Sequence, residues 1–360
     1  MAHAEPPLHV LILAGGIGSR FWPASTASRP KQLLSLSGPR SLIEETVERA
    51  RTLAPPERIR ILTGYHLVEP IRRALPEALG RSFLVEPHAR GTAPVLAWAA
   101  WLVAREDPDA IILSLHSDHL IRPPEEFTRT LRAAAQLATD QDMLVAVAVP
   151  PSRPETGYGY IRPGEPLPVS EGERGLDGFR VEAFVEKPDA TTARLYLEKG
   201  CLWNSGIFAW TAHRFLEEVR THAPEVGEHL SLLEEDDAEG FFQAVSPISV
   251  DEAVLERSGR VASVRATFEW DDVGSWEALT RTRSADSEGN VTVGSVQAVE
   301  SSGNIVYAEG GPVVLFGAEN LVVVRTRGAT FVTPRERTGD LKELFRHLSE
   351  ELRDPEESTE

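Results

Sequence analysis

The sequence predicts an α/β protein with a small β-rich unit at its C-terminal end, and three observations support this prediction. Short apolar runs alternate with amphipathic segments over the first 150 residues, which is typical of strand–helix–strand units in a mainly parallel sheet. From about residue 286, short apolar runs follow one another closely, separated by glycine and asparagine. The length of 360 residues suits one large domain with a smaller one beside it.

The first strand is expected at residues 8–14, because LHVLILA is almost continuously apolar, as in parallel strands that are covered on both faces. Four more strands are expected at 59–63, 83–86, 110–115 and 143–149. Helical segments are expected between them at 41–53, 66–79, 92–105 and 125–139. The alternation predicts a Rossmann-like, mainly parallel mixed sheet flanked by helices. Right-handed crossovers would align the loops after the strands along one edge, where ligands usually bind.

The regular alternation of predicted strands and helices ends after residue 150. Strands are expected in 156–161, 178–188, 203–210 and 260–268, and helices at 189–199 and over most of 212–257. The closely spaced β pattern of the last part predicts a small sheet or a few turns of β-helix, followed by a helix at 338–351 and an acidic tail. We therefore expect a catalytic domain at 1–283 and a small β-rich domain at 284–360.

Composition excludes several classes of protein. Hydrophobic residues make up 41% and charged residues 26% of the chain, which is ordinary for a globular protein. There is no apolar run long enough for a transmembrane helix, and MAHAEPPLHV does not resemble a secretory signal. A single cysteine, Cys201, suits the cytoplasm. The net charge of −18 argues against nucleic acid as a partner.

The loop directly after the first strand, AGGIGSR at 14–20, is the first candidate site. Phe21 breaks the G-x-G-x-x-G dinucleotide pattern, and no Gly-Lys-Ser/Thr follows at P-loop spacing. What remains is a glycine-rich turn whose backbone N–H groups can surround a phosphate, with Arg20 and Lys31 adding the positive charge that phosphoryl chemistry needs. The alternative is a tight strand-to-helix turn with solvated basic residues.

The string AGGIGSRFWPAS…RPKQLL resembles the signature of the sugar-nucleotide pyrophosphorylases, within which it is most similar to the branch that uses GTP and mannose 1-phosphate. Further matching strings follow in the family's order over roughly the first 280 residues: EPHARGTAP (86–94), HSDHLI (116–121), TGYGYI (156–161), FVEKP (184–188), WNSGIF (203–208) and WDDVGSW (270–276). The β-rich tail is similar to the small C-terminal domain of that family. Gly91 stands where the mannose type usually has asparagine, and His116-Ser117 where it has proline-alanine.

The resemblance implies an enzyme that transfers a guanylyl group from GTP to mannose 1-phosphate with Mg²⁺ and without a covalent intermediate. The chain ends before the phosphomannose isomerase domain that some relatives carry, so we expect a single activity. Two alternatives remain open: a uridylyl-, thymidylyl- or adenylyltransferase for glucose 1-phosphate, and a non-catalytic nucleotide-binding subunit. The sequence does not determine the oligomeric state, for which a homodimer is one option.

The candidate metal ligands are Asp118 and Asp272. Asp118 follows an apolar strand at the ligand edge, where a carboxylate can hold Mg²⁺ or simply cap a turn. Asp272 is its partner by the family resemblance, in preference to the adjacent Asp271. His116 and His119 flank Asp118 and raise the question of zinc, which the absence of a cysteine or a second histidine cluster disfavours.

The remaining roles come mainly from the resemblance. It implies Arg20, Lys31 and Lys187 as catalytic residues. Asn204 suits sugar hydroxyls because its amide both donates and accepts, although an Asx-turn would also explain it. Gly159 permits either close approach to the sugar or a hairpin bend. The expected nucleotide-binding residues are Leu13, Ala14, Gly15, Gly16, Gly18, Ser19, Arg90, Thr92 and Ser117, and the expected sugar-phosphate residues are Gly159, Glu186, Lys187 and Asn204. Arg90 and Thr92 open a helix whose N-terminus favours anions, or they are an ordinary helix start.

Overall fold

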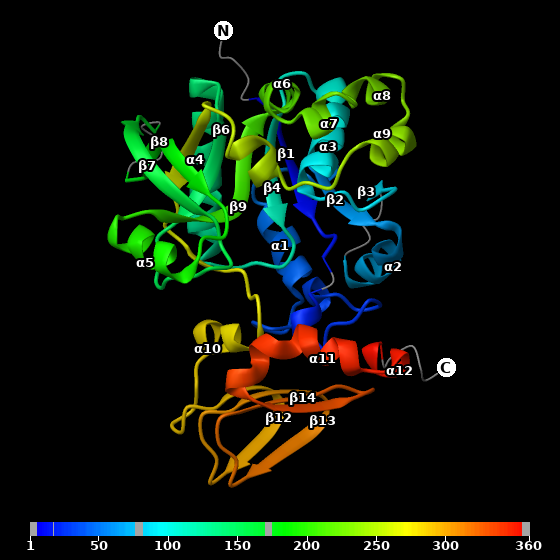
Figure 1. Ribbon diagram of the computed structural model, residues 1–360, viewed down its shortest axis with the longest axis vertical. Coiled ribbons are helices and arrows are strands. Elements are labelled where there is room, and N and C mark those ends of the chain that lie inside the picture. Colours follow the sequence, from blue (N-terminus) through cyan, green and yellow to red (C-terminus); the bar gives the residue numbers. More distant parts are fainter. Residues whose placement is uncertain (1–5, 17, 76–81, 170–174, 355–360) are drawn as a thin grey trace.

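The computed structural model describes residues 6–16, 18–75, 82–169 and 175–354. They form a large α/β unit and a smaller β unit, with the terminal helices lying across the junction (Figure 1). Within the described residues, no helix is long and apolar enough to cross a membrane.

Strands and helices alternate along the first part of the chain, as the sequence predicts. The elements are β1 (Leu8–Leu13), α1 (Leu42–Ala50), β2 (Ile59–Gly64), α2 (Tyr65–Ala74), β3 (Phe83–Glu86), α3 (Thr92–Glu106) and β4 (Ile111–His116). Residues 76–79 of the helix expected at 66–79 lie outside the described residues. Helix α1 begins with a capping box, in which Ser41 and Glu44 each accept the backbone N–H of the other, so its start is fixed locally.

The second part of the large unit is more varied. Its strands are β5 (Leu120–Arg122), β6 (Leu144–Val149), β7 (Tyr160–Leu167), β8 (Gly178–Val185), β9 (Leu202–Thr211), β10 (Val261–Arg265) and β11 (Glu269–Asp271). Its helices are α4 (Pro124–Gln141), α5 (Ala190–Glu198), α6 (Ala212–His222), α7 (Pro224–Gly227), α8 (Leu230–Glu234), α9 (Ala238–Ala244), a π-helical turn (Asp251–Leu255) and α10 (Leu279–Thr282). Strand β7 begins only at Tyr160, later than the expected 156. Residues 156–159 bend instead, and Tyr158 is directed to Asp272 by a hydrogen bond.

In the part of the chain that the structure describes, nine strands form one mixed sheet in the order β3-β2-β1-β4-β9-β6-β10-β8-β7. Strands β3, β2, β1 and β4 are parallel, whereas β9 runs antiparallel to β4 and β6. The carboxyl ends of the four parallel strands therefore share one edge. A separate pair, β11 with β5, places Asp271 opposite Leu120 and so brings 270–272 beside the loop after β4.

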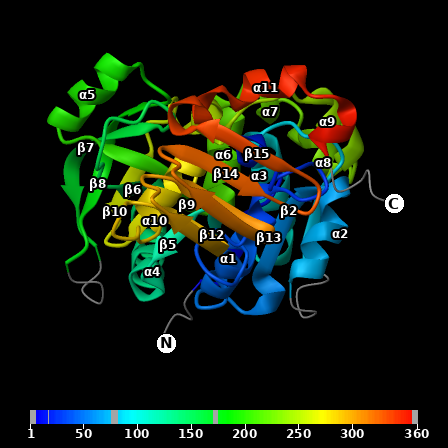
Figure 2. The same cartoon turned by 90° about the horizontal axis from the view of Figure 1, so that it is seen from below.

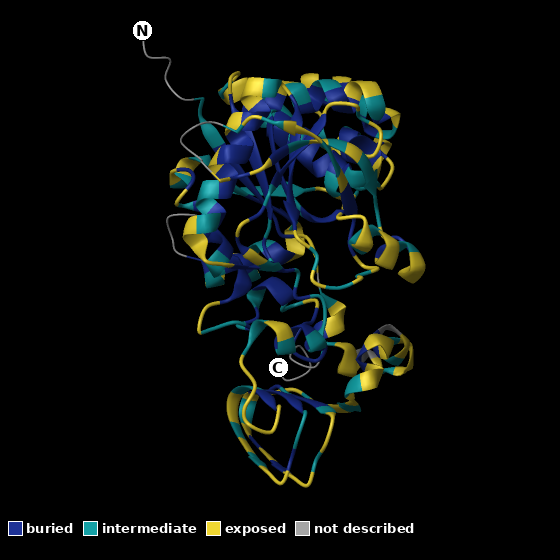
Figure 3. Ribbon diagram, turned by 90° about the vertical axis from the view of Figure 1, so that its left-hand side faces the viewer, coloured by how far each residue is buried: buried dark blue, intermediate teal, exposed yellow. Residues whose placement is uncertain are grey.

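Helices cover both faces of the sheet, which gives three layers with a core on each side. Val10 and Ile12 of β1 face α1, α2 and α4 in one core. Leu11 and Leu13 of the same strand face α3 and the α6–α9 helices in the other. Figure 3 shows the buried residues concentrated along the sheet, with exposed residues on the outer surfaces of the helices. Strand β1 is apolar on both faces because helices cover both faces of the sheet.

The smaller unit is β-helix-like, as predicted. Strands β12 (Val291–Val299), β13 (Ile305–Phe316) and β14 (Leu321–Arg325) are parallel neighbours, and β15 (Thr330–Pro334) runs antiparallel to β14. Asn304 donates to the side chain of Asn290 on the preceding coil at 2.9 Å, so the coils are joined at a turn. Figure 1 shows these strands below the large unit, and in Figure 2, which is seen from below, they lie in front of it.

The helix expected at 338–351 is wrong as a single element. The chain forms two short helices, α11 (Leu341–His347) and α12 (Glu350–Arg353). Leu348 and Ser349 between them are extended, and serine favours this conformation at the start of a helix. The break turns the chain so that the Leu352 carbonyl accepts the indole N–H of Trp22 at 3.0 Å.

The two units share a hydrophobic core. Phe21 and Trp276 from the large unit contact each other edge-on, and Trp276 lies 5.3 Å from Tyr307 of β13. The signature loop after β1 thus rests on the β-rich unit. The expected boundary at 283/284 lies between α10 and β12 and stays a prediction.

Candidate functional site

A cavity of about 320 Å³ opens at the shared edge of the parallel strands. Three apolar side chains, Leu13, Leu62 and Val95, form part of its wall. The other lining residues are Gly15, Gly16, Gln32, Glu86, Ala89, Gly91, Thr92, His116, Ser117 and Asp118. The size and the mixture of an apolar wall with a few polar groups are typical of a small-molecule site.

The glycine loop forms one rim of this cavity. A side chain at Gly16 would meet nothing within 4 Å, so the space in front of its backbone is open to a ligand. Gly18 is required sterically, since its φ is 73° and a Cβ there would lie 2.3 Å from Lys31 Cβ. The loop therefore leaves room on one side and packs against Lys31 on the other.

Lys31 joins the two predicted metal ligands. Its Nζ donates to Asp118 Oδ2 at 2.8 Å and to the main-chain oxygen of Asp272 at 2.5 Å, and its side chain is only 7% exposed. Burial acts to raise the pKa of Asp118, but the neighbouring positive charge, chiefly the Lys31 ammonium, outweighs burial and holds that pKa well below its usual range. Asp118 is therefore ionised at neutral pH.

Asp272 rather than Asp271 faces this centre. Asp271 is held by Arg281 through two hydrogen bonds of 2.7 and 3.0 Å. Asp272 Oδ1 accepts the Tyr158 hydroxyl at 2.5 Å and the Gly274 N–H at 3.1 Å. Burial raises the pKa of Asp272 above its usual value, which indicates a carboxylate that a nearby cation would stabilise.

The oxygen atoms present fit a hard divalent cation. Among the described residues, no protein partner is seen for Asp118 Oδ1 or for Asp272 Oδ2. Each carboxylate thus keeps one oxygen free while the other is held in place. Mg²⁺ prefers such oxygen ligands and commonly uses one or two carboxylates together with substrate phosphates.

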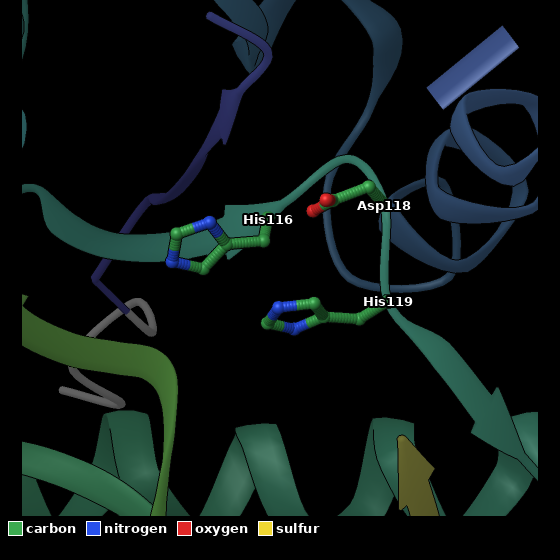
Figure 4. A group of neighbouring side chains, drawn as sticks. All are labelled: His116, Asp118 and His119. Carbon is green, nitrogen blue, oxygen red and sulfur yellow. The ribbon is translucent and has the colours of Figure 1, made fainter. Parts of the chain in front are cut away.

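His116, Asp118 and His119 lie together, with their possible ligand atoms within 4.8 Å of one another. Figure 4 shows the two rings stacked, with Asp118 on the loop between them. The Trp270 indole N–H donates to His119 Nδ1 at 3.1 Å. Because burial holds the pKa of His119 well below its usual value, the ring is neutral, and its other nitrogen carries the proton. His119 then has no lone pair for a metal, which leaves fewer ligands than zinc sites use.

The predicted sugar-phosphate residues lie together and are connected to Asp272 through Tyr158. A Cβ at Gly159 would lie 2.5 Å from Glu186 Oε2 and 3.2 Å from Asn204 Cβ, so a side chain there would require the Glu186 carboxylate and Asn204 to shift. Lys187 Nζ forms an ion pair with Glu186, and the Lys187 backbone N–H donates to the Tyr158 carbonyl at 3.2 Å. The assignment of Gly159 to the close approach of a sugar stays a prediction.

Asp251 completes this group. The Asn204 amide donates to Asp251 Oδ1 at 2.8 Å and accepts the Gly206 N–H at 3.1 Å. Burial, followed by the nearby Glu186 carboxylate, raises the pKa of Asp251 to about 7. A half-buried acid beside an oriented amide is suited to hydrogen-bonding hydroxyl groups.

Hydrogen bonds connect the start of α3 with Phe242 and Val250. Arg90 Nε donates to the Phe242 carbonyl at 2.8 Å, and Thr92 accepts the Val250 N–H at 2.8 Å. Gly91 has a φ of 84°, and a Cβ there would lie 2.5 Å from the Ile248 carbonyl oxygen, which explains glycine instead of asparagine. Arg90 thus contributes to packing here, while Thr92 also lines the cavity.

Some of the predicted site residues line the cavity and others do not. Leu13, Gly15, Gly16, Thr92, Ser117 and Asp118 line the cavity. Ala14, Gly18, Ser19 and Arg90 do not line it, and Ala14 uses its carbonyl to accept from Thr63 and Gln32. Arg20 is exposed and, among the described residues, has no hydrogen bond or ion pair. The roles assigned to all these residues stay predictions.

Three residues of the site were not singled out from the sequence. Glu86 lies inside the string EPHARGTAP, so its place after a strand was a signal that could have been used. Tyr158 lies inside TGYGYI, but the sequence does not reveal its partner 114 residues away. Asp251 has no distinguishing pattern around it, because its role depends on contacts made only in the folded chain.

Comparison with known proteins shows the class. The nucleotidyl transferase family matches residues 9–289, and the family described as "MannoseP isomerase/GMP-like beta-helix domain" matches residues 294–348. The chain belongs to the nucleotidyl transferase family and is an enzyme of that class. The fold and the cavity with its glycine loop agree with this membership.

The chain is similar to several individual proteins of known name. The chain is 36% identical to the mannose-1-phosphate guanylyltransferase of Escherichia coli, over 96% of this chain and 74% of that protein. It is 34% identical to the alginate biosynthesis protein AlgA of Pseudomonas aeruginosa, over 94% of this chain and 71% of that protein. The crystal structure of a mannose-1-phosphate geranyltransferase from Thermus thermophilus superposes with a TM-score of 0.86 at 35% identity, covering 94% of this chain and 98% of that one.

Proposed function

We propose that this enzyme transfers a guanylyl group from GTP to mannose 1-phosphate, with Mg²⁺ as the divalent ion and GDP-mannose and pyrophosphate as products. The observation that carries the proposal is Lys31, which links Asp118 and Asp272 next to a cavity rimmed by Gly15 and Gly16. The names of the relatives in Escherichia coli and Thermus thermophilus support the choice of mannose 1-phosphate.

In this reaction a phosphate oxygen of mannose 1-phosphate attacks the α-phosphorus of GTP in line, and pyrophosphate leaves from the opposite side. The protein contributes mainly orientation and charge. The glycine loop and Arg20 bind the triphosphate, and Lys31 stabilises the charge that develops on the transferred group. Asp118 and Asp272 would hold Mg²⁺, which neutralises phosphate charge when bound.

The sugar phosphate occupies the group around Gly159 in this proposal. Lys187 is 62% exposed and carries the charge that orients the attacking phosphate. Glu186 and Asn204 read the sugar hydroxyls, and Asp251 fixes the Asn204 amide. The absence of a side chain at Gly159 lets the sugar approach the backbone.

Glu86 supports guanine as the base. Its carboxylate lines the cavity beside Gly15, and among the described residues no hydrogen bond or ion pair satisfies it. A carboxylate only accepts hydrogen bonds, and its two oxygens suit two adjacent donors. Guanine presents such a pair, N1–H and the 2-amino group, whereas uracil and thymine present a single N–H between two acceptors. Neighbouring Leu13, Leu62 and Val95 provide an apolar wall for a planar ring.

Assembly and location belong to the same proposal. We propose a cytoplasmic homodimer whose catalytic and β-rich domains divide at 283/284, and which binds no nucleic acid because the chain carries a net charge of −18.

The test is pyrophosphate release with Mg²⁺ from GTP, ATP, UTP and dTTP, each combined with mannose 1-phosphate and with glucose 1-phosphate. We expect release with GTP and mannose 1-phosphate above all other pairs. Preference for another pair would overturn the substrates and retain the reaction class. Absence of release with every pair, from folded protein, would overturn the proposed activity and favour a nucleotide-binding subunit.

A further inference from the structure

Tyr158 connects the predicted metal site with the predicted sugar-phosphate site. Its hydroxyl donates to Asp272 Oδ1 at 2.5 Å, and its main-chain oxygen accepts the Lys187 N–H at 3.2 Å. The next residue is Gly159, whose carbonyl accepts the Asn204 N–H at 2.8 Å. One short segment thus contacts residues of both sites.

The ring of Tyr158 is held rigidly. It packs edge-on against Trp203, with ring centroids 5.2 Å apart, and against Trp270, at 5.0 Å. The residue as a whole is only 8% exposed. Aromatic pairs of this geometry are stabilising and restrict ring motion, so the position of the hydroxyl oxygen is set by packing.

The direction of the hydroxyl proton is also set. Arg153 Nη2 donates to the Tyr158 oxygen at 3.2 Å, and its guanidinium lies 5.7 Å from the ring centroid. Because arginine can only donate, the tyrosine oxygen accepts from it and its own proton is directed to Asp272. The Asp272 carboxylate receives a fixed donor on Oδ1 and keeps Oδ2 free.

The backbone has an unfavourable conformation at two positions next to the hydrogen bonds of Tyr158. Lys187 has a φ of 47° and Val273, directly after Asp272, has a φ of 45°. Positive φ is uncommon outside glycine and is unfavourable, so it persists only where the surroundings hold it. Tyr158 supplies a hydrogen bond at both places, to Lys187 itself and to the residue before Val273.

We propose that Tyr158 is a positioning residue whose hydroxyl orients the Asp272 carboxylate for a divalent cation while its main chain aligns Lys187 with the same centre. This inference rests on the proposed function for its metal and phosphate. Removing the hydroxyl leaves the ring packing intact and takes away the shorter of the two hydrogen bonds that orient Asp272 Oδ1, so that only the Gly274 N–H holds this oxygen. Loss of an outer-shell partner of this kind typically costs 10–100-fold in metal affinity or activity.

The chain offers a matched control in Tyr160. The residue is 1% exposed, and its hydroxyl accepts the Glu155 N–H at 2.9 Å rather than contacting Asp272. Tyr158→Phe and Tyr160→Phe therefore remove the same atom from two neighbouring buried tyrosines. Thermal unfolding of both variants is measured first, so that a folding defect is recognised.

Two readouts are compared in the full chain: the dissociation constant of Mn²⁺ alone, by electron paramagnetic resonance, and the Mg²⁺ concentration for half-maximal pyrophosphate release. For Tyr158→Phe we expect both to rise roughly 10–100-fold, with a smaller change in KM for GTP, while Tyr160→Phe stays near the wild type. Wild-type values in Tyr158→Phe, an equal loss in Tyr160→Phe, or no Mn²⁺ binding by the wild type would each overturn the inference. A wild type without pyrophosphate release would instead overturn the proposed function, while the Mn²⁺ measurement would still report on Tyr158.

Discussion

Lys31 and Glu86 illustrate two ways in which single residues define the site. Lys31 is buried between a carboxylate and a carbonyl oxygen, so its ammonium is both held in place and partly neutralised. Glu86 is the reverse case, a carboxylate without a protein partner among the described residues. Burial raises the pKa of Glu86 to about 7, which indicates that the surrounding protein groups do not stabilise its charge.

Glu86→Gln tests how the base is recognised. If the carboxylate accepts from the 2-amino group of guanine, the wild type prefers GTP over ITP, which lacks that group, by roughly 10-fold or more. The variant should bind GTP more weakly and lose most of this preference. The ratio of kcat/KM for GTP and ITP is measured in both proteins. If the variant instead narrows the difference between GTP and 2′-deoxy-GTP, Glu86 contacts the ribose and our assignment is wrong.

The same residue predicts a pH dependence of stability. In the folded protein the pKa of Glu86 is raised, so the folded state binds its proton more tightly than the unfolded state does. Folding is therefore penalised increasingly as the pH rises from about 4.5 to about 7, and fully above that. Glu86→Gln should raise Tm at pH 8 and leave it nearly unchanged at pH 4.5. Equal Tm differences at both pH values would contradict this.

At the scale of elements, the loop after β1 sets the geometry of the site, because one side of the loop faces the cavity and the other side packs on Lys31. Gly18→Ala introduces a Cβ 2.3 Å from Lys31 Cβ at a positive φ. We expect a loss of roughly 1–3 kcal/mol in stability and of most activity, since Lys31 must move. Urea unfolding and pyrophosphate release measure the two effects.

Gly16→Ala is the matched control in the same loop. Its Cβ would meet nothing within 4 Å of the protein, so stability should stay within about 0.5 kcal/mol of the wild type. If the phosphates approach the Gly16 backbone, KM for GTP should still rise. Unchanged KM would place the triphosphate elsewhere on the loop.

Many positions of the strands and loops could be predicted from the sequence. The apolar run at 8–14, the glycine loop and the strand before Asp118 are local patterns, and local patterns determine where strands and loops occur. The single helix expected at 338–351 was wrong because Leu348 and Ser349 are extended and a second helix begins after the serine, a local start signal that was not used. Tyr158 and Asp251 were missed for another reason, since only folding brings them to Asp272 and Asn204.

At the scale of the whole molecule, the β-rich unit supports the loop after β1. Trp22 packs against Phe331 and Phe345 of the C-terminal part, with ring centroids 5.4 and 6.1 Å apart. Phe21, directly before it, contacts Trp276 in the shared core. The two units should therefore depend on each other for stability and for the geometry of the loop.

Trp22→Ala tests this dependence. Removing a buried tryptophan should cost about 3–5 kcal/mol and lower activity, because the loop between β1 and Lys31 loses its support. Trp101→Ala is the control, since Trp101 lies on α3 with the Arg105 guanidinium 4.6 Å from its ring, away from the junction. It should affect stability less and activity little. Full activity in Trp22→Ala would show that the β-rich unit does not position the loop.

The central claim is that Lys31, Asp118 and Asp272 form the centre of guanylyl transfer. The most direct test compares pyrophosphate release from GTP and mannose 1-phosphate by the wild type, Asp118→Asn and Asp109→Asn, an exposed aspartate before the start of β4. We expect Asp118→Asn to retain its fold and lose roughly 100-fold or more in kcat/KM, and Asp109→Asn to match the wild type. Wild-type activity in Asp118→Asn would contradict the account.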